Sequence, residues 1–223
     1  MNNSRQVYTF SFLFVIAVCK NLSAQVPVRE EPHHKVVLEN DYVRLIDVHI
    51  PAHDTTLAHI HAAPSAIVFL SKTIIGTQIV GAQPVIANVT PGQTSYAAYH
   101  EKPITHRVWN QGSSLFHVMD IELVRKIPGN DTGKIIWPAS MQLQWQQKLV
   151  TTYKIALKKE NRLVIPKSAS AYLLIDITGA IKVNSGGNMH KLKSGEFVFA
   201  SPRNEIDLAA NNAGAECVLL ELK

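Results

Sequence analysis

Residues 57–64 read LAHIHAAP and residues 105–110 read THRVWN, and these two stretches decide the fold. Successive side chains of a β-strand point to opposite faces, so His59 and His61 lie on one face of a strand. A third imidazole, that of His106, completes a set of three nitrogen ligands if a neighbouring strand carries it. The two stretches therefore predict β-structure with an open metal site made of His59, His61 and His106.

Short apolar runs separated by turn residues recur along the first half of the chain. Glycine, proline or asparagine punctuates them, and no helical period is sustained. Such spacing is typical of an all-β sandwich or barrel. The strands are expected at residues 36–50, 66–70, 74–80, 85–89 and 115–124.

These motifs resemble those of the cupin superfamily. Cupins carry H-x-H followed three or four residues later by Glu, and a second motif that reads P-x-G and then H-x-x-x-N. Here the second motif is Pro91-Gly92 followed by His106 and Asn110, with the glycine one place early. The resemblance spans residues 36–124 and implies a jelly-roll barrel, also called a double-stranded β-helix.

The chain departs from the cupin pattern at the acidic ligand, because the Glu position holds Ser65 or Ala66. Loss of that negative charge disfavours hard ions and leaves a site suited to Fe, Zn, Ni or a similar divalent metal. Three histidines leave positions open for water or substrate, as Lewis-acid or O₂ chemistry requires. Thiol-oxidising iron cupins with three histidines are the precedent that the resemblance supplies. Glu101, on a predicted loop, could replace the missing acid if its loop folds over the barrel mouth.

The second half of the chain repeats the pattern of the first. Residues 191–199 parallel residues 87–95, which predicts a bicupin: two tandem cupin-like barrels in an all-β chain. The place of His106 in this repeat falls at Leu208, and the only histidine there is His190, on a predicted turn. We therefore interpret residues 149–223 as a degenerate cupin-like half without metal ligands.

The N-terminal 24 residues are expected to be a signal peptide. Arg5 precedes an apolar run at residues 10–18 that is too short to cross a bilayer, which needs about 20 residues. The small residue Ala24 suits cleavage, so the mature chain would start at Gln25. This predicts a secreted or periplasmic protein with no integral membrane segment after processing.

The remaining boundaries follow from composition. Residues 36–125 form the predicted N-terminal barrel, and residues 126–148 the linker to the second half. Within the linker, residues 126–133 are a loop by composition. Residues 138–148 are rich in glutamine and are expected to be a short helix or an irregular connector.

Charge and cysteine content exclude some functions. The formal net charge is +5, and without Arg5 and Lys20 it falls to +3, too little to argue for nucleic acid. Cys217 is left alone once the signal peptide is removed, so it has no internal disulfide partner and core packing is its expected role.

Three hypotheses remain open. The first is a metal-dependent dioxygenase, or a related hydrolase or isomerase, acting on a small molecule in the barrel mouth. The second is a non-catalytic module that binds a small molecule or stores a metal, and a purely structural barrel is the third possibility. The aromatic residues Tyr96, Tyr99 and Trp109 either line the cavity or belong to the core. The sequence leaves open whether the protein is a monomer or a homodimer.

Overall fold

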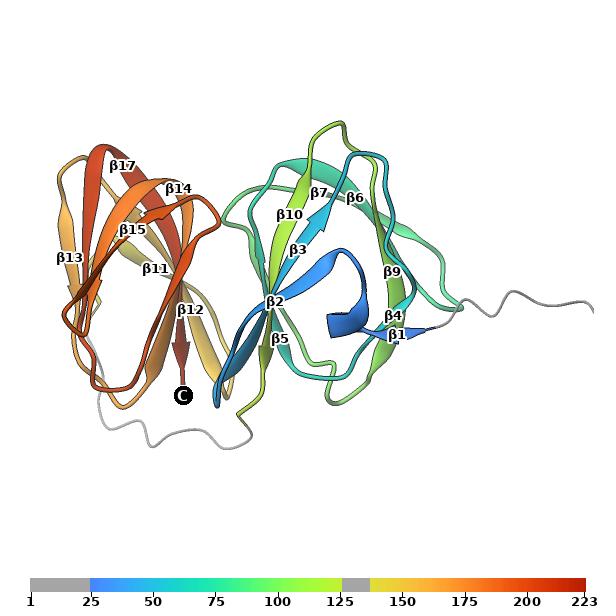
Figure 1. Ribbon diagram of the computed structural model, residues 1–223, viewed down its shortest axis with the longest axis horizontal. Helices are drawn as coiled ribbons and strands as arrows, with labels where there is room; N and C mark the ends of the chain where they lie inside the picture. Colours follow the sequence, from blue (N-terminus) through green and yellow to red (C-terminus); the bar gives the residue numbers. More distant parts are fainter. Residues whose placement is uncertain (1–24, 126–136) are drawn as a thin grey trace, which may run out of the picture.

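The computed structural model describes residues 25–125 and 137–223, which form β-strands joined by turns (Figure 1). The one helical element in these two ranges is the 3-10 turn η1 (Val28–Glu30). The all-β prediction is thereby confirmed. In the part of the chain described, no helix is long and apolar enough to cross a membrane. The predicted signal peptide at 1–24 and the loop at 126–133 lie outside the described residues.

Residues 25–125, here called the N-terminal unit, form two five-stranded sheets. The first sheet runs, in spatial order, β1 (Val26–Pro27), β4 (His59–His61), β9 (Ile104–Asn110), β6 (Thr73–Ile79) and β7 (Val85–Val89). The second sheet runs β2 (His34–Glu39), β3 (Val43–Ile50), β10 (Phe116–Leu123), β5 (Ser65–Phe69) and β8 (Thr94–Ala97).

The second sheet is apolar on both faces in its central strands. On β3, Ile46, Val48 and Ile50 join one buried cluster, and Val43 and Leu45 join another. Because side chains alternate along a strand, the first set faces the interior of the N-terminal unit and the second faces outward. Residues 43–50 read VRLIDVHI, so Arg44, Asp47 and His49 interrupt an otherwise apolar run.

Residues 137–223, here called the C-terminal unit, form one seven-stranded sheet. Its main path runs β11 (Met141–Gln146), β12 (Val150–Leu157), β17 (Ile206–Leu222), β14 (Ala171–Ser185) and β15 (Asn188–Lys193). Two further strands pair off this path, β13 (Arg162–Ile165) with β17 and β16 (Phe197–Ala200) with β14.

The expectation of a short helix or irregular connector over residues 138–148 is wrong at its centre, where β11 pairs antiparallel with β12. The sequence of β11 alternates Met141, Leu143 and Trp145 with glutamines, which is the two-residue period of a strand. Met141 is buried and Leu143 is exposed, and the register shifts between Leu143 and Trp145.

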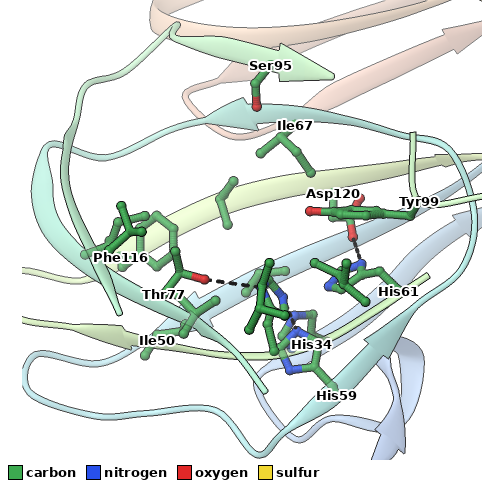
Figure 2. Close-up of a pocket in the computed structure, with 18 of the residues that line it drawn as sticks. His34, Ile50, His59, His61, Ile67, Thr77, Ser95, Tyr99, Phe116 and Asp120 are labelled. Atoms are coloured by element: carbon green, nitrogen blue, oxygen red, sulfur yellow. Dashed lines mark hydrogen bonds and ion pairs between the residues drawn. The ribbon is translucent and has the colours of Figure 1, made fainter. Parts of the chain in front are cut away.

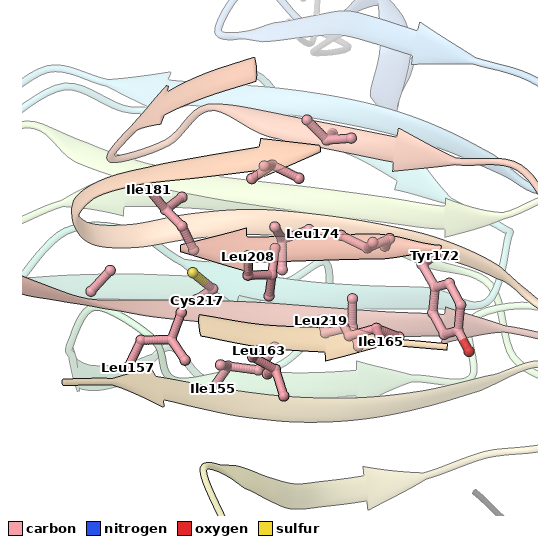
Figure 3. Close-up of a cluster of buried hydrophobic side chains, with 14 of the residues drawn as sticks. Ile155, Leu157, Leu163, Ile165, Tyr172, Leu174, Ile181, Leu208, Cys217 and Leu219 are labelled. Carbon is pink, nitrogen blue, oxygen red and sulfur yellow. The ribbon is translucent and has the colours of Figure 1, made fainter. Parts of the chain in front are cut away.

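Aliphatic side chains fill the interior of the C-terminal unit (Figure 3). Ile155, Leu174, Leu208, Cys217 and Leu219 are all fully buried there. Leu208, the residue that the predicted repeat sets against His106, is part of this buried apolar cluster. This interior is a packed core, and Cys217 takes the core role expected of it.

The two units pack against each other through a shared apolar cluster. Leu45, Val68 and Ile121 of the N-terminal unit contribute to it together with Leu173 and Val218 of the C-terminal unit. Figure 1 shows the second sheet, with β2 and β5, on the side of the N-terminal unit that faces the C-terminal strands. Part of the outward face of the second sheet is therefore an internal contact of the chain, while its inward face is free to line a cavity.

One carboxylate interrupts the core of the C-terminal unit. Asp176 is fully buried, pairs with Cys217 in the β14–β17 register, and has no hydrogen-bond partner on either oxygen. Burial, and then the neighbouring Glu196, raise the pKa of Asp176 to about 7. The folded protein therefore keeps this side chain neutral across most of the acidic range.

We predict that this carboxylate makes stability pH-dependent. Between the usual pKa of 3.8 and about 7, the folded chain holds a proton that the unfolded chain releases. The free energy of unfolding should therefore fall as pH rises through this window. Urea titrations across it should show a smaller fall for Asp176→Asn than for the natural protein, whereas Asp41→Asn, at an exposed position, should keep the full slope. An unchanged slope in Asp176→Asn would contradict the prediction.

Candidate metal centre

The structure brings the three predicted histidines together. His59 and His61 lie on β4, and His106 lies on β9, where it is the direct cross-strand partner of His59. One nitrogen of each ring lies within 4.8 Å of one nitrogen of each other ring. The H-x-H spacing and the antiparallel register thus place three imidazoles on the same face of the first sheet.

Hydrogen bonds orient two of these rings. His59 Nδ1 lies 2.9 Å from the carbonyl oxygen of Leu57, and a carbonyl only accepts, so Nδ1 donates and Nε2 keeps its lone pair. His106 Nδ1 lies 3.3 Å from Thr77 Oγ1. The Nε2 atoms of His59 and His106 lie 3.0 Å apart. Both rings therefore turn Nε2 toward a common point, as metal-binding histidines held through Nδ1 do.

The third ring, that of His61, lies beside the carboxylate of Asp120. His61 Nδ1 lies 3.3 Å from Asp120 Oδ2, and neither oxygen of Asp120 has a hydrogen-bond partner. The Asp120 side chain is only 5% exposed. In Figure 2, Asp120 lies with Tyr99 on one side of His61, and His34 lies with His59 on the other. A buried carboxylate without partners is costly, and a positive charge on or beside His61 would offset that cost.

Asp120 brings a buried carboxylate to within 3.3 Å of His61, although Ser65 or Ala66 stands at the expected Glu position. Ala66 faces the C-terminal unit, and Ser65, although buried, does not line the cavity. Asp120 enters instead from β10, as the cross-strand partner of Ile67 on β5. Glu101 does not replace the missing acid, because its side chain is 74% exposed at the surface.

A fourth histidine flanks the site. The ring of His34 on β2 lies 4.7 Å from that of His59, centroid to centroid, and its Nδ1 pairs with the buried carboxylate of Glu31. Glu31 also accepts from the backbone N–H of Leu57, two residues before His59. Burial opposes ionisation of Glu31, but hydrogen bonds from His34 and His33 outweigh it and lower the pKa of Glu31 to about 2. An ionised Glu31 thus ties β2 to the segment that carries His59.

Burial keeps two of the three clustered rings neutral. It lowers the pKa of His59 to about 4 and that of His106 to about 3. Neighbouring histidines lower both values further. Neutral imidazole is the form that coordinates a metal, so no proton has to be removed from these rings near neutral pH.

The rings open into a cavity of about 520 Å³ between the two sheets of the N-terminal unit. Most of its walls are aliphatic or aromatic, and the polar exceptions are the four histidines, Asp120, Tyr99, Thr77, Ser95 and Gln83. Ile79 and Val85, at the ends of β6 and β7, line the cavity and are 44% and 60% exposed, so it reaches solvent beside that hairpin. Its size suits a small organic molecule.

Of the three aromatic candidates, one lines the cavity and two pack elsewhere in the N-terminal unit. Tyr99 lines the cavity with its ring 4.9 Å from that of His61. Tyr96 packs into the contact between the units, and Trp109 lies against Gly76, where an added Cβ would meet the indole at 2.0 Å. His190 lies on β15 of the other unit, on a strand and not on the predicted turn.

Sequence reasoning missed Asp120 and His34 as parts of the site. The available signal for Asp120 was a lone acid inside the apolar strand that residues 116–123 form. For His34 it was the pair His33-His34 directly before a strand.

No protein-family model and no curated protein matches the chain. Many solved structures do, among them a cupin 2 conserved barrel domain protein from Leptotrichia buccalis, with a TM-score of 0.56 and 11% identity over 85% of this chain and 88% of that one. A salicylate 1,2-dioxygenase from Pseudaminobacter salicylatoxidans aligns with a TM-score of 0.58 and 10% identity over 81% of this chain and 71% of that one. The bacterial pirin YhhW from Escherichia coli, in complex with nickel(II), aligns with a TM-score of 0.58 and 17% identity over 85% of this chain and 90% of that one.

At these identities the comparisons establish the fold, and the chain has the cupin fold that its motifs led us to expect.

We predict that Asp120 tunes the metal affinity of the three histidines. A carboxylate behind a ligating histidine fixes the ring and raises its basicity, and its loss typically costs 10–100-fold in affinity. Asp120→Asn should therefore bind zinc on the order of 10–100-fold more weakly than the natural protein in a competition with a chromophoric chelator. Glu101→Gln, at an exposed carboxylate, is the matched control and should bind as the natural protein does. Weaker zinc binding by Glu101→Gln, with unchanged binding by Asp120→Asn, would show that Glu101 and not Asp120 tunes the metal affinity.

Proposed function

We propose that the protein is a metal-dependent enzyme, of dioxygenase type, that acts on a small, uncharged and largely apolar molecule. The observation that carries this proposal is the opening of the histidine cluster into the apolar cavity. A site that only stored a metal would not need an apolar chamber of this size beside it. Enclosed apolar pockets with a few convergent polar groups are the usual setting of small-molecule chemistry.

The donor set fits a divalent transition metal. Neutral imidazoles suit iron, nickel, zinc and similar ions, and His59, His61 and His106 would hold the ion. Three protein ligands leave positions open for water or substrate. Such an ion supplies Lewis acidity or, if it is redox-active, electron transfer to and from dioxygen. The choice among metals is open to experiment.

The chain's own residues have separable roles in this scheme. Asp120, Thr77 and the Leu57 carbonyl orient the three rings through Nδ1. The apolar walls exclude water, which strengthens polar interactions inside the cavity. Burial, and then Asp120, raise the pKa of Tyr99 to about 12, so its phenol stays protonated and is available to donate a hydrogen bond to a substrate oxygen.

The charge of the walls indicates the substrate class. The described residues that line the cavity include no lysine or arginine, and Asp120 is their one carboxylate. A carboxylate or phosphate group on the substrate would be buried there with no cationic side chain to pair with it, which is unfavourable. A neutral molecule of largely apolar surface fits best.

We predict that activity depends on each of the three histidines. A dioxygen-uptake screen of Fe(II)-loaded protein with neutral aromatic and aliphatic alcohols should find turnover, and His59→Ala, His61→Ala or His106→Ala should reduce it at least about 100-fold by removing a ligand. His190→Ala, on β15 of the other unit, is the control and should leave the rate unchanged. Stoichiometric metal and full turnover in His59→Ala would overturn the proposal. Metal binding without turnover of any compound would favour a non-catalytic binding module.

The charge argument has its own test within that screen. Each neutral substrate should be accompanied by the same molecule with an added carboxylate. The neutral member of each pair should have a kcat/KM at least about tenfold higher, which corresponds to about 1.4 kcal/mol, because a carboxylate placed away from the ion has no cationic side chain to pair with. Preference for the anionic members would contradict the assignment of substrate class.

We also propose that the protein is exported and that its two units are tandem cupin barrels. The length of the apolar run at 10–18 supports export, and the sheet built from residues 137–223 alone supports a second barrel. N-terminal sequencing of protein from the native cell envelope should return Gln25 as the first residue. A cytoplasmic protein that keeps residues 1–24 would refute export.

A further inference from the structure

A second cluster of metal-ligating side chains lies outside the cavity. It consists of Asp47, His49 and His117, here called the outer cluster. His117 Nε2 lies 2.7 Å from Asp47 Oδ1, and His49 Nδ1 lies 3.6 Å from Asp47 Oδ2. The two imidazoles stack with centroids 4.1 Å apart and planes inclined by 22°. One ligand atom from each of the three residues lies within 4.8 Å of the other two.

Strand geometry explains this grouping and separates it from the cavity. Asp47 and His49 are two residues apart on β3, so they share a face, and His117 on β10 is the direct cross-strand partner of His49. The alternate residues Val48 and Val118 line the cavity. The outer cluster therefore occupies the opposite face of the second sheet, with the sheet itself between the two groups of histidines.

The outer cluster borders the contact between the two units. The α-carbon of Gly195 packs so closely on His117 that an added Cβ would lie 2.8 Å from the ring. At 20%, 21% and 44%, the exposed fractions of the His117, Asp47 and His49 side chains leave the group half-buried but open to solvent on one side. An ion could reach it without unfolding of either unit.

The C-terminal unit offers an internal comparison. Val43 pairs with Leu123 in the first unit as Val150 pairs with Leu222 in the second. If the two units are aligned on these pairs, Lys154 stands at the position of Asp47 and Glu216 at the position of His117. Lys154 and Glu216 form an ion pair at 3.1 Å.

In the C-terminal unit, an ordinary ion pair therefore occupies this position. In the other, the same place carries a carboxylate and two imidazoles, which is a donor set that borderline metals prefer.

We propose that Asp47, His49 and His117 form a second site for a divalent transition metal such as zinc, copper or nickel. The ion would take a carboxylate oxygen from Asp47 and one nitrogen from each imidazole, and would join β3 to β10 beside the Gly195 turn. This site does not depend on the proposed function of the cavity, because the two share no residue.

Zinc titration of the full chain tests this proposal. The decisive comparison is between His59→Ala and the double variant His59→Ala/His49→Ala, measured by isothermal calorimetry and by metal analysis after gel filtration. We expect the single variant to bind one zinc that the double variant does not bind. His49 is the residue to replace because its side chain is 44% exposed, and Asp47→Asn in the same background should weaken that zinc at least about tenfold.

The controls separate the two proposals. His59→Ala/His190→Ala should keep the outer zinc, since His190 lies on β15. If the cavity histidines bind no zinc, only the number of zinc ions bound by the natural protein changes. The difference in zinc content between His59→Ala and His59→Ala/His49→Ala depends on the outer cluster alone. Equal zinc content in those two variants, with both folded by circular dichroism, would overturn the proposal.

Discussion

The antiparallel pairing of β4 with β9 is the constraint on which the candidate site depends. It makes His59 and His106 direct partners, and the two-residue period of β4 adds His61 on the same face. A shift of one residue would turn β4's side chains to the other face. The outer face of the first sheet would then carry His59 and His61, and the cavity would keep only His106. Glu31 supports this register by accepting from the N–H of Leu57, just before β4.

The two units use the same strand patterns for different ends. In the N-terminal unit, two separate sheets leave a cavity between them, and polar residues from β2, β4, β6, β9 and β10 enter it. In the C-terminal unit, Leu208 and its neighbours close the interior, and Asp176 is the isolated acid left within it. The apolar contact between the units covers part of the outward face of the second sheet. Where they are covered, β3 and β10 are apolar on both faces.

Much of the fold and part of the site could be predicted from the sequence. The H-x-H period and the second motif led to three histidines that do converge. Apolar runs predicted β5, β6, β7 and β10, and predicted β2 and β3 as a single strand, whereas β1 and β8 were missed. Asp120 could not be assigned a face, because almost every residue of β10 is buried and the strand shows no alternation. His34 escaped because only the packing of β2 beside β4 brings it to His59, a contact that no local pattern encodes. The strand β11 was missed because its glutamines were weighed by composition and its two-residue period was not.

The central claim is that His59, His61 and His106 hold one metal ion at the wall of the cavity. Crystals grown with zinc and measured by anomalous diffraction at the zinc edge test it most directly. The account predicts an anomalous peak in the cavity bonded to one ring nitrogen of each histidine at about 2.0–2.1 Å. Diverging rings with no peak between them, or an ion held by fewer than all three histidines, would contradict it.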